Sequence, residues 1–299
     1  MKILYVTDLD GTLLKSDDKM SEYTIETINN LIDNGMCFSY ATARSLSSAS
    51  VVTKDLTTNI PVIIYNGTFI VNAYTKEKIF SLYFNDVEKE MIISKLNKYP
   101  IFPLVYGYIN GEEKVSWIKS QENDGIKRYL NLRKGDKRLR PIETKEELYS
   151  GKLFYFTCIG EREELTDIYN YFKDSNNFTC TLQQELYRKE YWCEIMPKKA
   201  TKGNAILTLK EKLKCDKIIT FGDSVNDIPM FKISDESYAV ENAVDELKKY
   251  ATGIIMSNEK DGVAHWLDEN ILSSPFHQNT PQTPKINLKS TQNQLKRRY

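Results

Sequence analysis

Residues that bind zinc or form disulfides are scarce in this sequence. The chain has two histidines and five cysteines among 299 residues. The cysteines are Cys37, Cys158, Cys180, Cys193 and Cys215. Because their number is odd and no pair suggests a zinc ligand set, we expect reduced thiols in a cytosolic protein. His265 and His277 have no partner motif, and we expect no role for either.

Long apolar runs and an overall charge excess are also absent. No run approaches the ~20 residues that a membrane span needs, and Met1 leads directly into an apolar segment without a signal peptide. We therefore expect a cytoplasmic protein with no membrane partner. Residues 271–299 carry five basic residues and no acid, which leaves 36 basic and 41 acidic residues in 1–270. That net charge of −5 predicts no nucleic-acid partner.

The N-terminal segment sets two carboxylates two residues apart. The run from Lys2 to Val6 is typical of a buried parallel strand, and Asp8-Leu9-Asp10-Gly11-Thr12 follows it. Gly11 allows a turn whose backbone N–H groups can gather around an anion. One carboxylate can attack while the other handles a proton, but two acids this close repel each other unless a cation lies between them. The stretch therefore predicts a metal site. The alternative interpretation is an acidic turn that neither binds a metal nor takes part in catalysis.

Two further polar clusters end the next predicted strands. The predicted elements are a helix over 21–35, a strand over 36–41, a helix over 45–56 and a strand over 62–65. Strands separated by helices predict a doubly wound parallel sheet, in which ligands bind beyond the carboxyl ends of the strands. Thr42-Ala43-Arg44 and Asn66-Gly67 lie at such ends. Alternatively, Thr42 is an ordinary strand-end hydroxyl, Arg44 a surface arginine and Asn66-Gly67 only a hairpin turn.

From Leu82 to Lys189 the pattern changes to that of a second module, which we call the insert. Two strand-like runs flank Asn110-Gly111, which is a hairpin signal, and the segment predicts an α+β module. A helix over 202–213 and a strand over 217–221 then restore the α/β alternation. The predicted domains are the first part of the core over 1–81, the insert over 82–189, the second part of the core over 190–270 and a disordered basic tail over 271–299.

A second acidic motif follows the predicted strand over 217–221. It reads Gly222-Asp223-Ser224-Val225-Asn226-Asp227. Two acids on a glycine-containing turn can complete an oxygen-rich magnesium site, with Asp223 as a direct ligand and Asp227 supporting it from behind. The alternative is a capped turn before a helix, for which Pro229 is well suited.

Together these motifs resemble those of the haloacid dehalogenase superfamily, in its Cof-type branch (type IIB, with a C2 cap). The resemblance spans roughly residues 2–270. It implies an α/β fold, with a doubly wound Rossmann-like parallel sheet core and an inserted α+β cap domain. It also implies a magnesium-dependent phosphatase that hydrolyses small phosphomonoesters (a sugar phosphate, nucleotide or cofactor phosphate) through an aspartyl-phosphate. The second motif departs from the common Thr-Gly-Arg at Ala43, and Ser224 stands where glycine is common.

The same resemblance implies roles for individual residues. The catalytic residues are Asp8 as nucleophile, Asp10 as acid and base, Thr42 on a phosphoryl oxygen and Lys202 against the phosphate charge. Contacts to phosphate or substrate are implied for Leu9, Arg44, Asn66, Gly67 and Asn226. Mg²⁺ is implied as the cofactor, held by Asp8, the Asp10 backbone carbonyl and Asp223, with Asp227 in support. Thr201-Lys202-Gly203 at a helix start favours Lys202 over the neighbouring Lys198 and Lys199.

Two alternative functions remain from the sequence. A phosphosugar mutase of the same superfamily would share Asp8 and Asp10 but return the phosphoryl group to a sugar. A non-catalytic phosphate-binding or scaffold protein would use the basic tail to bind a partner. The presence of every catalytic residue type favours the enzyme.

Overall fold

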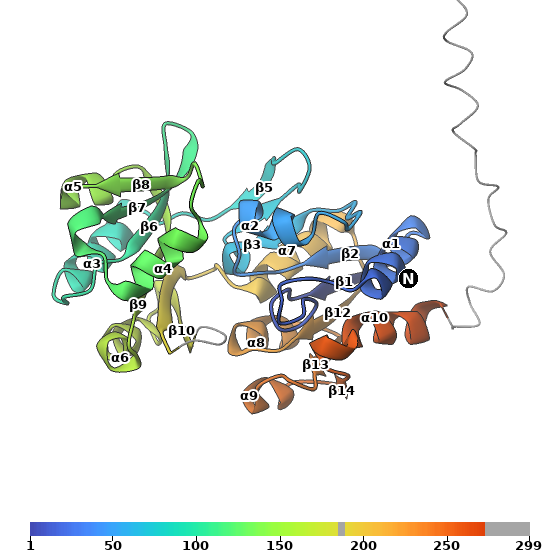
Figure 1. Ribbon diagram of the computed structural model, residues 1–299. Helices are drawn as coiled ribbons and strands as arrows, with labels where there is room; N and C mark the ends of the chain where they lie inside the picture. Colours follow the sequence, from blue (N-terminus) through green and yellow to red (C-terminus); the bar gives the residue numbers. More distant parts are fainter. Residues whose placement is uncertain (185–188, 273–299) are drawn as a thin grey trace, which may run out of the picture.

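A computed structural model describes residues 1–184 and 189–272 of the chain (Figure 1). The predicted basic tail over 271–299 lies almost entirely outside the described residues. Among the helices of the described part, none combines the length and the apolar character that crossing a membrane requires.

The core is built on a five-stranded parallel sheet, as the alternation of strands and helices predicted. Its strands are β1 (Ile3–Thr7), β2 (Cys37–Tyr40), β12 (Lys217–Gly222), β13 (Glu236–Val240) and β14 (Gly253–Ile255). They lie in the order β14-β13-β12-β1-β2, and every neighbouring pair is parallel. Successive residues of β1 point to opposite faces and almost all are buried, so both faces of the sheet are covered. β1 and β12 are adjacent, which brings the two acidic motifs together.

The three longest helices of the core begin at polar side chains that cap them. The core helices are α1 (Glu22–Asp33), α2 (Leu46–Val52), α7 (Lys202–Leu213), α8 (Ile228–Phe231), α9 (Asp245–Lys248) and α10 (Gly262–Leu267). Ser21, Ser45 and Thr201 cap α1, α2 and α7 by accepting a backbone N–H at the third helical residue. α7 has the bounds that the sequence predicted, whereas α2 is shorter than the predicted 45–56. The remaining turns are η1 (Tyr65–Gly67), η2 (Lys119–Gln121), η3 (Val225–Asp227), η4 (Asn258–Lys260) and η5 (Asp268–Leu272).

The third predicted core strand turns back on itself. β3 (Val62–Ile64) pairs antiparallel with β4 (Phe69–Val71), and β4 pairs with β5 (Lys78–Ser81). In the part of the chain that the structure describes, one parallel bridge, between Ala41 and Ile63, joins β3 to the segment that follows β2. The third predicted strand therefore forms and lies parallel to the segment after β2, but its regular pairing is antiparallel, with β4. The reason lies in the turn, because Tyr65, Asn66 and Gly67 all have positive φ and reverse the chain.

The insert forms a six-stranded sheet, which we call the insert sheet. Its strands are β6 (Leu104–Ile109), β7 (Glu112–Ile118), β8 (Leu139–Ile142), β9 (Lys152–Gly160), β10 (Phe178–Gln184) and β11 (Tyr191–Pro197), in the order β10-β11-β9-β6-β7-β8. All pairs are antiparallel except β7 with β8. Asn110-Gly111 makes the predicted hairpin between β6 and β7. The insert helices are α3 (Asp86–Leu96), α4 (Asp124–Leu132), α5 (Lys145–Leu148) and α6 (Arg162–Phe172).

Strand β11 belongs to the insert sheet rather than to the core. The sequence predicts a return to the core at residue 190, but β11 lies between β9 and β10 and pairs with both. The α/β pattern returns only at α7, so the chain leaves the insert sheet at Pro197. The error arose because a single apolar strand does not reveal which sheet it joins.

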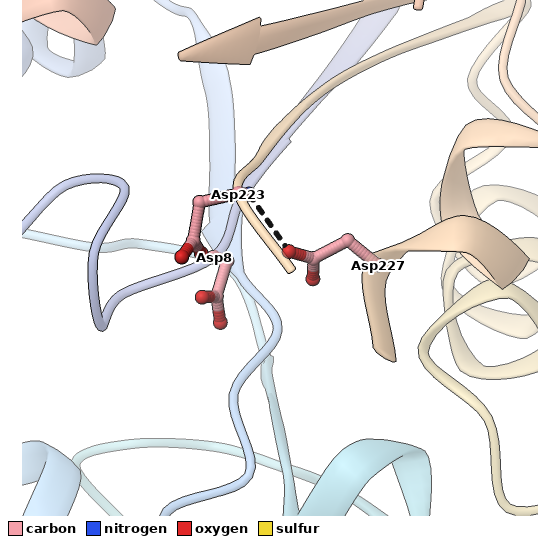
Figure 2. A group of neighbouring side chains, drawn as sticks. All are labelled: Asp8, Asp223 and Asp227. Carbon is pink, nitrogen blue, oxygen red and sulfur yellow. Dashed lines mark hydrogen bonds between the residues drawn. The ribbon is translucent and has the colours of Figure 1, made fainter. Parts of the chain in front are cut away.

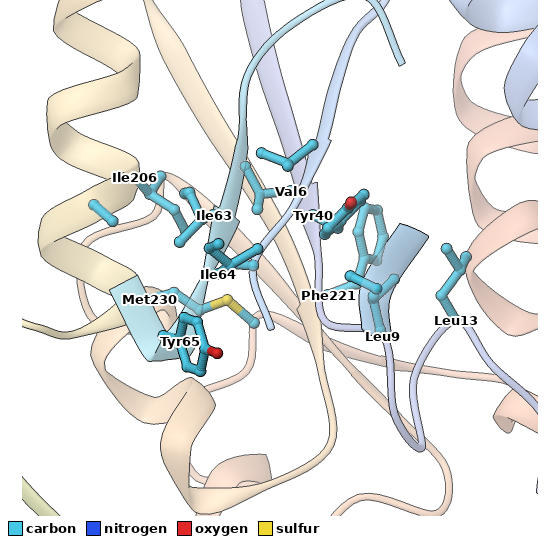
Figure 3. Close-up of a cluster of buried hydrophobic side chains, with 14 of the residues drawn as sticks. Val6, Leu9, Leu13, Tyr40, Ile63, Ile64, Tyr65, Ile206, Phe221 and Met230 are labelled. Carbon is cyan, nitrogen blue, oxygen red and sulfur yellow. The ribbon is translucent and has the colours of Figure 1, made fainter. Parts of the chain in front are cut away.

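The two faces of the insert sheet pack against different partners. Val105, Phe156 and Cys193 lie in a buried cluster with residues of α3 and α6. Tyr106 and Tyr155, on the opposite face, join the buried cluster of the core, where both rings lie against Tyr65. Figure 3 shows part of this cluster, including Tyr65. The insert therefore presents one face of its sheet to the core (Figure 1).

Candidate active site

Asp8 lies at the carboxyl end of β1, in contact with a buried lysine. Its backbone N–H donates to the Phe221 carbonyl at 2.9 Å, which continues the pairing with β12 by one residue. Lys202 donates from Nζ to Asp8 Oδ1 at 2.6 Å. Lys202 is the first residue of α7 and only 1% exposed, so its ammonium is fixed against Asp8 rather than hydrated.

Asp227 holds this lysine from the other side and shapes the second acidic loop. Its Oδ1 accepts from Lys202 Nζ at 2.6 Å, and its Oδ2 accepts from the backbone N–H groups of Asp223 and Ser224 at 2.9 and 3.0 Å. Figure 2 shows the contact with Asp223. Both oxygens of Asp227 thus accept hydrogen bonds from the protein, which agrees with a carboxylate that holds Lys202 and the Asp223 loop in place rather than binding a metal directly.

Three buried carboxylates converge at this point. Asp8, Asp223 and Asp227 have oxygens that all lie within 4.8 Å of one another (Figure 2). Burial raises the pKa of Asp8 well above its usual range, and the charges of Asp227 and Asp223 add to the rise while Lys202 opposes it. Burial, then the charge of Asp227, raises the pKa of Asp223 to about 7. Three acids against one lysine leave an excess of negative charge that a divalent cation would neutralise, and carboxylate oxygens are ligands that Mg²⁺ prefers.

The turn after β1 fits closely around Asp223. Gly11 has φ +74, and a Cβ placed on it would lie 2.5 Å from Asp223 Oδ2. Thr12 donates from Oγ1 to Asp223 Oδ1 at 2.9 Å. Thr12 belongs to the first motif, but the motif alone does not predict this contact. Its hydroxyl orients Asp223 across the two strands.

Asp10 is held by an arginine rather than pointing at Asp8. Arg44 Nε donates to Asp10 Oδ1 and Oδ2 at 3.0 and 2.9 Å, and one terminal nitrogen reaches Oδ1 at 2.5 Å. The same nitrogen contacts Asp18, which the sequence analysis did not single out, at 2.5 Å. Burial lowers the pKa of Arg44, but hydrogen bonds and the charges of Asp10 and Asp18 outweigh this and raise it. Arg44 therefore contacts the predicted acid and base instead of standing alone.

Thr42 and Leu9 occupy buried positions beside these groups. Thr42 Oγ1 accepts from the Arg44 backbone N–H at 3.1 Å, and the Thr42 carbonyl accepts from the Asn66 backbone N–H at 2.9 Å. The Leu9 side chain is fully buried in the core cluster (Figure 3). The predicted contact of Leu9 to phosphate can therefore come from its backbone but not from its side chain.

Gly67 allows the turn to approach the start of α7. It has φ +94, and a Cβ placed on it would lie 2.2 Å from the Thr201 carbonyl oxygen. No larger side chain fits there without moving the backbone. The glycine of Asn66-Gly67 therefore brings the predicted substrate contact Asn66 beside Lys202.

Asn66 and Asn226 link the core loops to the insert sheet. Asn226 Nδ2 donates to Asn66 Oδ1 at 3.1 Å. Asn66 Nδ2 donates to the Tyr155 hydroxyl at 2.8 Å and to Glu194 Oε2 at 3.3 Å. A second link runs from Gln183 Nε2 to Ser224 Oγ at 3.3 Å. Nothing in the sequence predicts the nearness of Tyr155, Gln183 and Glu194 to the site, because it depends on the pairing of distant strands.

The chain is similar to known proteins over most of its length. The family of haloacid dehalogenase-like hydrolases matches residues 5–267. A protein of Haemophilus influenzae named a putative phosphatase is 27% identical over 265 residues, which cover 88% of this chain and 96% of the relative. A 5-amino-6-(5-phospho-D-ribitylamino)uracil phosphatase of Bacillus subtilis is 26% identical, over 90% of this chain and 98% of its own. The crystal structure of a haloacid dehalogenase-like hydrolase from Bacteroides thetaiotaomicron has the same fold, with a TM-score of 0.74, 21% identity and coverage of 90% and 99%. The chain belongs to the haloacid dehalogenase-like hydrolase family.

Proposed function

We propose that this protein is a magnesium-dependent phosphatase that hydrolyses small phosphomonoesters through an aspartyl-phosphate on Asp8. The observation that carries the proposal is the pairing of Asp8 with the buried ammonium of Lys202 at 2.6 Å, beside the carboxylates of Asp223 and Asp227. A carboxylate fixed at the end of a central strand is well placed to attack phosphorus, and the positive charge beside it offsets the charge of the phosphoryl oxygens.

Two proton transfers accompany the proposed reaction. Asp8 attacks the phosphorus, the bond to the ester oxygen breaks, and Asp10 gives a proton to the leaving alcohol. Water then attacks the phosphorus of the aspartyl-phosphate, Asp10 takes a proton from it, and phosphate leaves with Asp8 restored. Arg44 holds the Asp10 carboxylate through both transfers.

Other residues hold charge and position. Asp8, Asp223 and the Asp10 carbonyl would hold Mg²⁺, which supplies positive charge against the phosphoryl oxygens when bound. Lys202 offsets charge on Asp8 and on the phosphate, and Asp227 keeps Lys202 and the 223–224 backbone in place. The contacts to a phosphoryl group that we assign are those of Thr42 and Asn226 and of the backbones of Leu9 and Gly67.

The name of the Bacillus subtilis relative, a 5-amino-6-(5-phospho-D-ribitylamino)uracil phosphatase, supports a small phosphorylated metabolite as substrate. We assign the insert, extended to Pro197, the part of a cap that covers the site and excludes bulk water. We further propose a cytoplasmic location, with no nucleic-acid or membrane partner.

Turnover of p-nitrophenyl phosphate tests the proposal. We expect magnesium-dependent release of phosphate that EDTA abolishes, and a loss of at least about 1,000-fold in Asp8→Asn, which keeps the volume but removes the nucleophile. Asp17→Asn is the matched control, because the Asp17 side chain is 58% exposed and, among the described residues, pairs at the surface with Lys19. Retained activity in Asp8→Asn would refute the covalent mechanism. Dependence on a sugar bisphosphate with transfer to sugar would favour the mutase, and no turnover would favour the non-catalytic alternative.

A further inference from the structure

Tyr65 of the core is hydrogen-bonded to a buried ion pair of the insert. Its hydroxyl donates to Glu113 Oε1 at 2.6 Å, and Arg138 Nη1 donates to the Tyr65 hydroxyl at 3.0 Å and to the same Glu113 oxygen at 2.7 Å. The guanidinium of Arg138 is in turn fixed by Asp136, which accepts from Nη2 at 2.6 Å. The side chains of Glu113 and Arg138 are only 18% and 12% exposed. Charged groups of β7 and of the turn before β8 therefore hold the hydroxyl of one core residue from two sides.

The backbone of Tyr65 has a conformation that a tyrosine rarely adopts. Its φ is +50, and the next two residues, Asn66 and Gly67, also have positive φ. Glycine enters this region without steric cost, whereas a bulky side chain does so where its surroundings hold it there. The ion pair at the hydroxyl holds Tyr65, together with the rings of Phe154 and Tyr155 of the insert sheet, whose centroids lie 5.1 and 5.5 Å from its own. The insert thus helps to maintain the strained turn.

Tyr65 is also bonded through its backbone to the segment that carries Arg44. The Tyr65 N–H donates to the Arg44 carbonyl at 3.0 Å, and the N–H of Asn66 donates to the Thr42 carbonyl at 2.9 Å. Arg44 in turn holds both carboxylate oxygens of Asp10 through Nε, at 3.0 and 2.9 Å. Because close-packed interiors transmit small shifts, a change in the backbone of Tyr65 would displace Arg44 and, with it, the guanidinium that orients Asp10.

We propose that Tyr65 is a positioning residue that couples docking of the insert to the orientation of Asp10. While the ion pair holds its hydroxyl, the turn stays strained and Asp10 stays oriented for proton transfer. Without the ion pair, Tyr65 relaxes and the orientation of Asp10 is lost. This inference rests on the proposed phosphatase function and gives the insert a part in acid–base catalysis besides covering the site. Replacing a buried ion pair by apolar groups often leaves a fold equally stable, so a geometric role accounts better for charged groups at this joint.

The test separates proton transfer from overall activity by comparing propyl phosphate with p-nitrophenyl phosphate. The propanol leaving group needs a proton from Asp10, whereas p-nitrophenolate leaves with little help. Tyr65→Phe keeps the ring but loses the hydroxyl, and should lower kcat by about tenfold or more for propyl phosphate and by about threefold or less for p-nitrophenyl phosphate. Glu113→Gln should shift the ratio of the two rates in the same direction. A loss caused by misfolding alone would lower both rates equally and leave the ratio unchanged.

Glu112→Gln is the matched control for the charge change in β7. Glu112 is the neighbour of Glu113, but its side chain is 73% exposed and pairs with Lys114. We expect the ratio of the two rates to stay within about twofold of wild type in this variant. An equal shift in Glu112→Gln would show that the ratio does not depend on the ion pair with Arg138, and would overturn the proposal.

A double variant tests whether Tyr65 acts through Arg44. In an Arg44→Met background, Tyr65→Phe should change the ratio of the two rates by no more than about twofold, because the contact through which it acts is already lost. An unchanged ratio in Tyr65→Phe alone, or the full additional change in the double variant, would overturn the coupling. Failure of the phosphatase proposal looks different, since the wild-type protein would then not turn over p-nitrophenyl phosphate.

Discussion

The excess negative charge of the carboxylate cluster predicts that removing one acid stabilises the metal-free protein. Burial and the charge of Asp227 raise the pKa of Asp223 to about 7 from an ordinary value of 3.8. A rise of that size means that the folded, metal-free protein pays about 4 kcal/mol to keep Asp223 charged. The cost is absent below the unfolded-state value and complete above the folded-state value, so at pH 8 it acts in full.

Asp223→Asn should remove this cost while its amide oxygen still accepts from Thr12. In EDTA at pH 8 we expect the free energy of unfolding to rise by about 1–4 kcal/mol, and the gain to shrink as the pH falls toward 4. Adding magnesium should stabilise the wild type and have little effect on the variant, because the variant lacks a ligand. Urea unfolding followed by circular dichroism measures both effects.

Asp227→Asn is the comparison that separates charge from hydrogen bonding. It also removes one negative charge, but Asp227 accepts from Lys202 and from two backbone N–H groups. An amide can present its oxygen to only one of these sides, so at least one buried donor loses its acceptor. We expect a loss of about 3 kcal/mol or more in EDTA. The reasoning fails if both variants shift the stability in the same direction.

Two further predictions concern the strained turn and Asp10. In urea unfolding, Gly67→Ala should lower the free energy of unfolding by at least about 1 kcal/mol more than Gly35→Ala. Both glycines have φ +94, but a Cβ on Gly67 would collide with the Thr201 carbonyl, whereas a Cβ on Gly35 would have no neighbour within 4 Å. Equal losses would show that backbone strain alone decides. Arg44→Met should lower kcat by about 100-fold on an alkyl phosphate and by less on p-nitrophenyl phosphate, whose good leaving group needs little help from Asp10. Asp18→Asn, which leaves the Arg44–Asp10 pair intact, should change neither rate by more than about threefold, and an equal loss in that variant would contradict the assignment.

The parts of the fold that local sequence controls were predictable. α7 begins and ends where its apolar spacing and the Thr201 cap indicate, and the hairpin at Asn110-Gly111 follows from the need for positive φ at both residues. The nearness of Asp8 to Asp223 was also predictable, because carboxyl ends of parallel strands meet at one edge of the sheet.

The parts that depend on distant pairing were not predictable. β11 could join either sheet on its pattern alone, and its true place decides that Glu194 faces the core. The ion pair between Arg44 and Asp10 could not be predicted either, since a motif indicates which residues lie near each other but not which side chains pair. Such information resides in side-chain geometry, which has no period along the chain.

The turn over residues 65–67 combines a locally determined backbone conformation with contacts to distant segments. Gly67 lets the backbone lie against Thr201, which fixes the start of α7 and with it Lys202. Asn66 donates a hydrogen bond to Tyr155 of the insert sheet. Tyr65 packs edge-on against Tyr106, and its hydroxyl donates to Glu113 at 2.6 Å. One three-residue turn therefore contacts both the helix that carries Lys202 and the insert sheet. Since interior packing transmits small shifts, a movement of the insert sheet must change the surroundings of Lys202 unless the turn absorbs it, and its three positive φ angles leave it little freedom to do so.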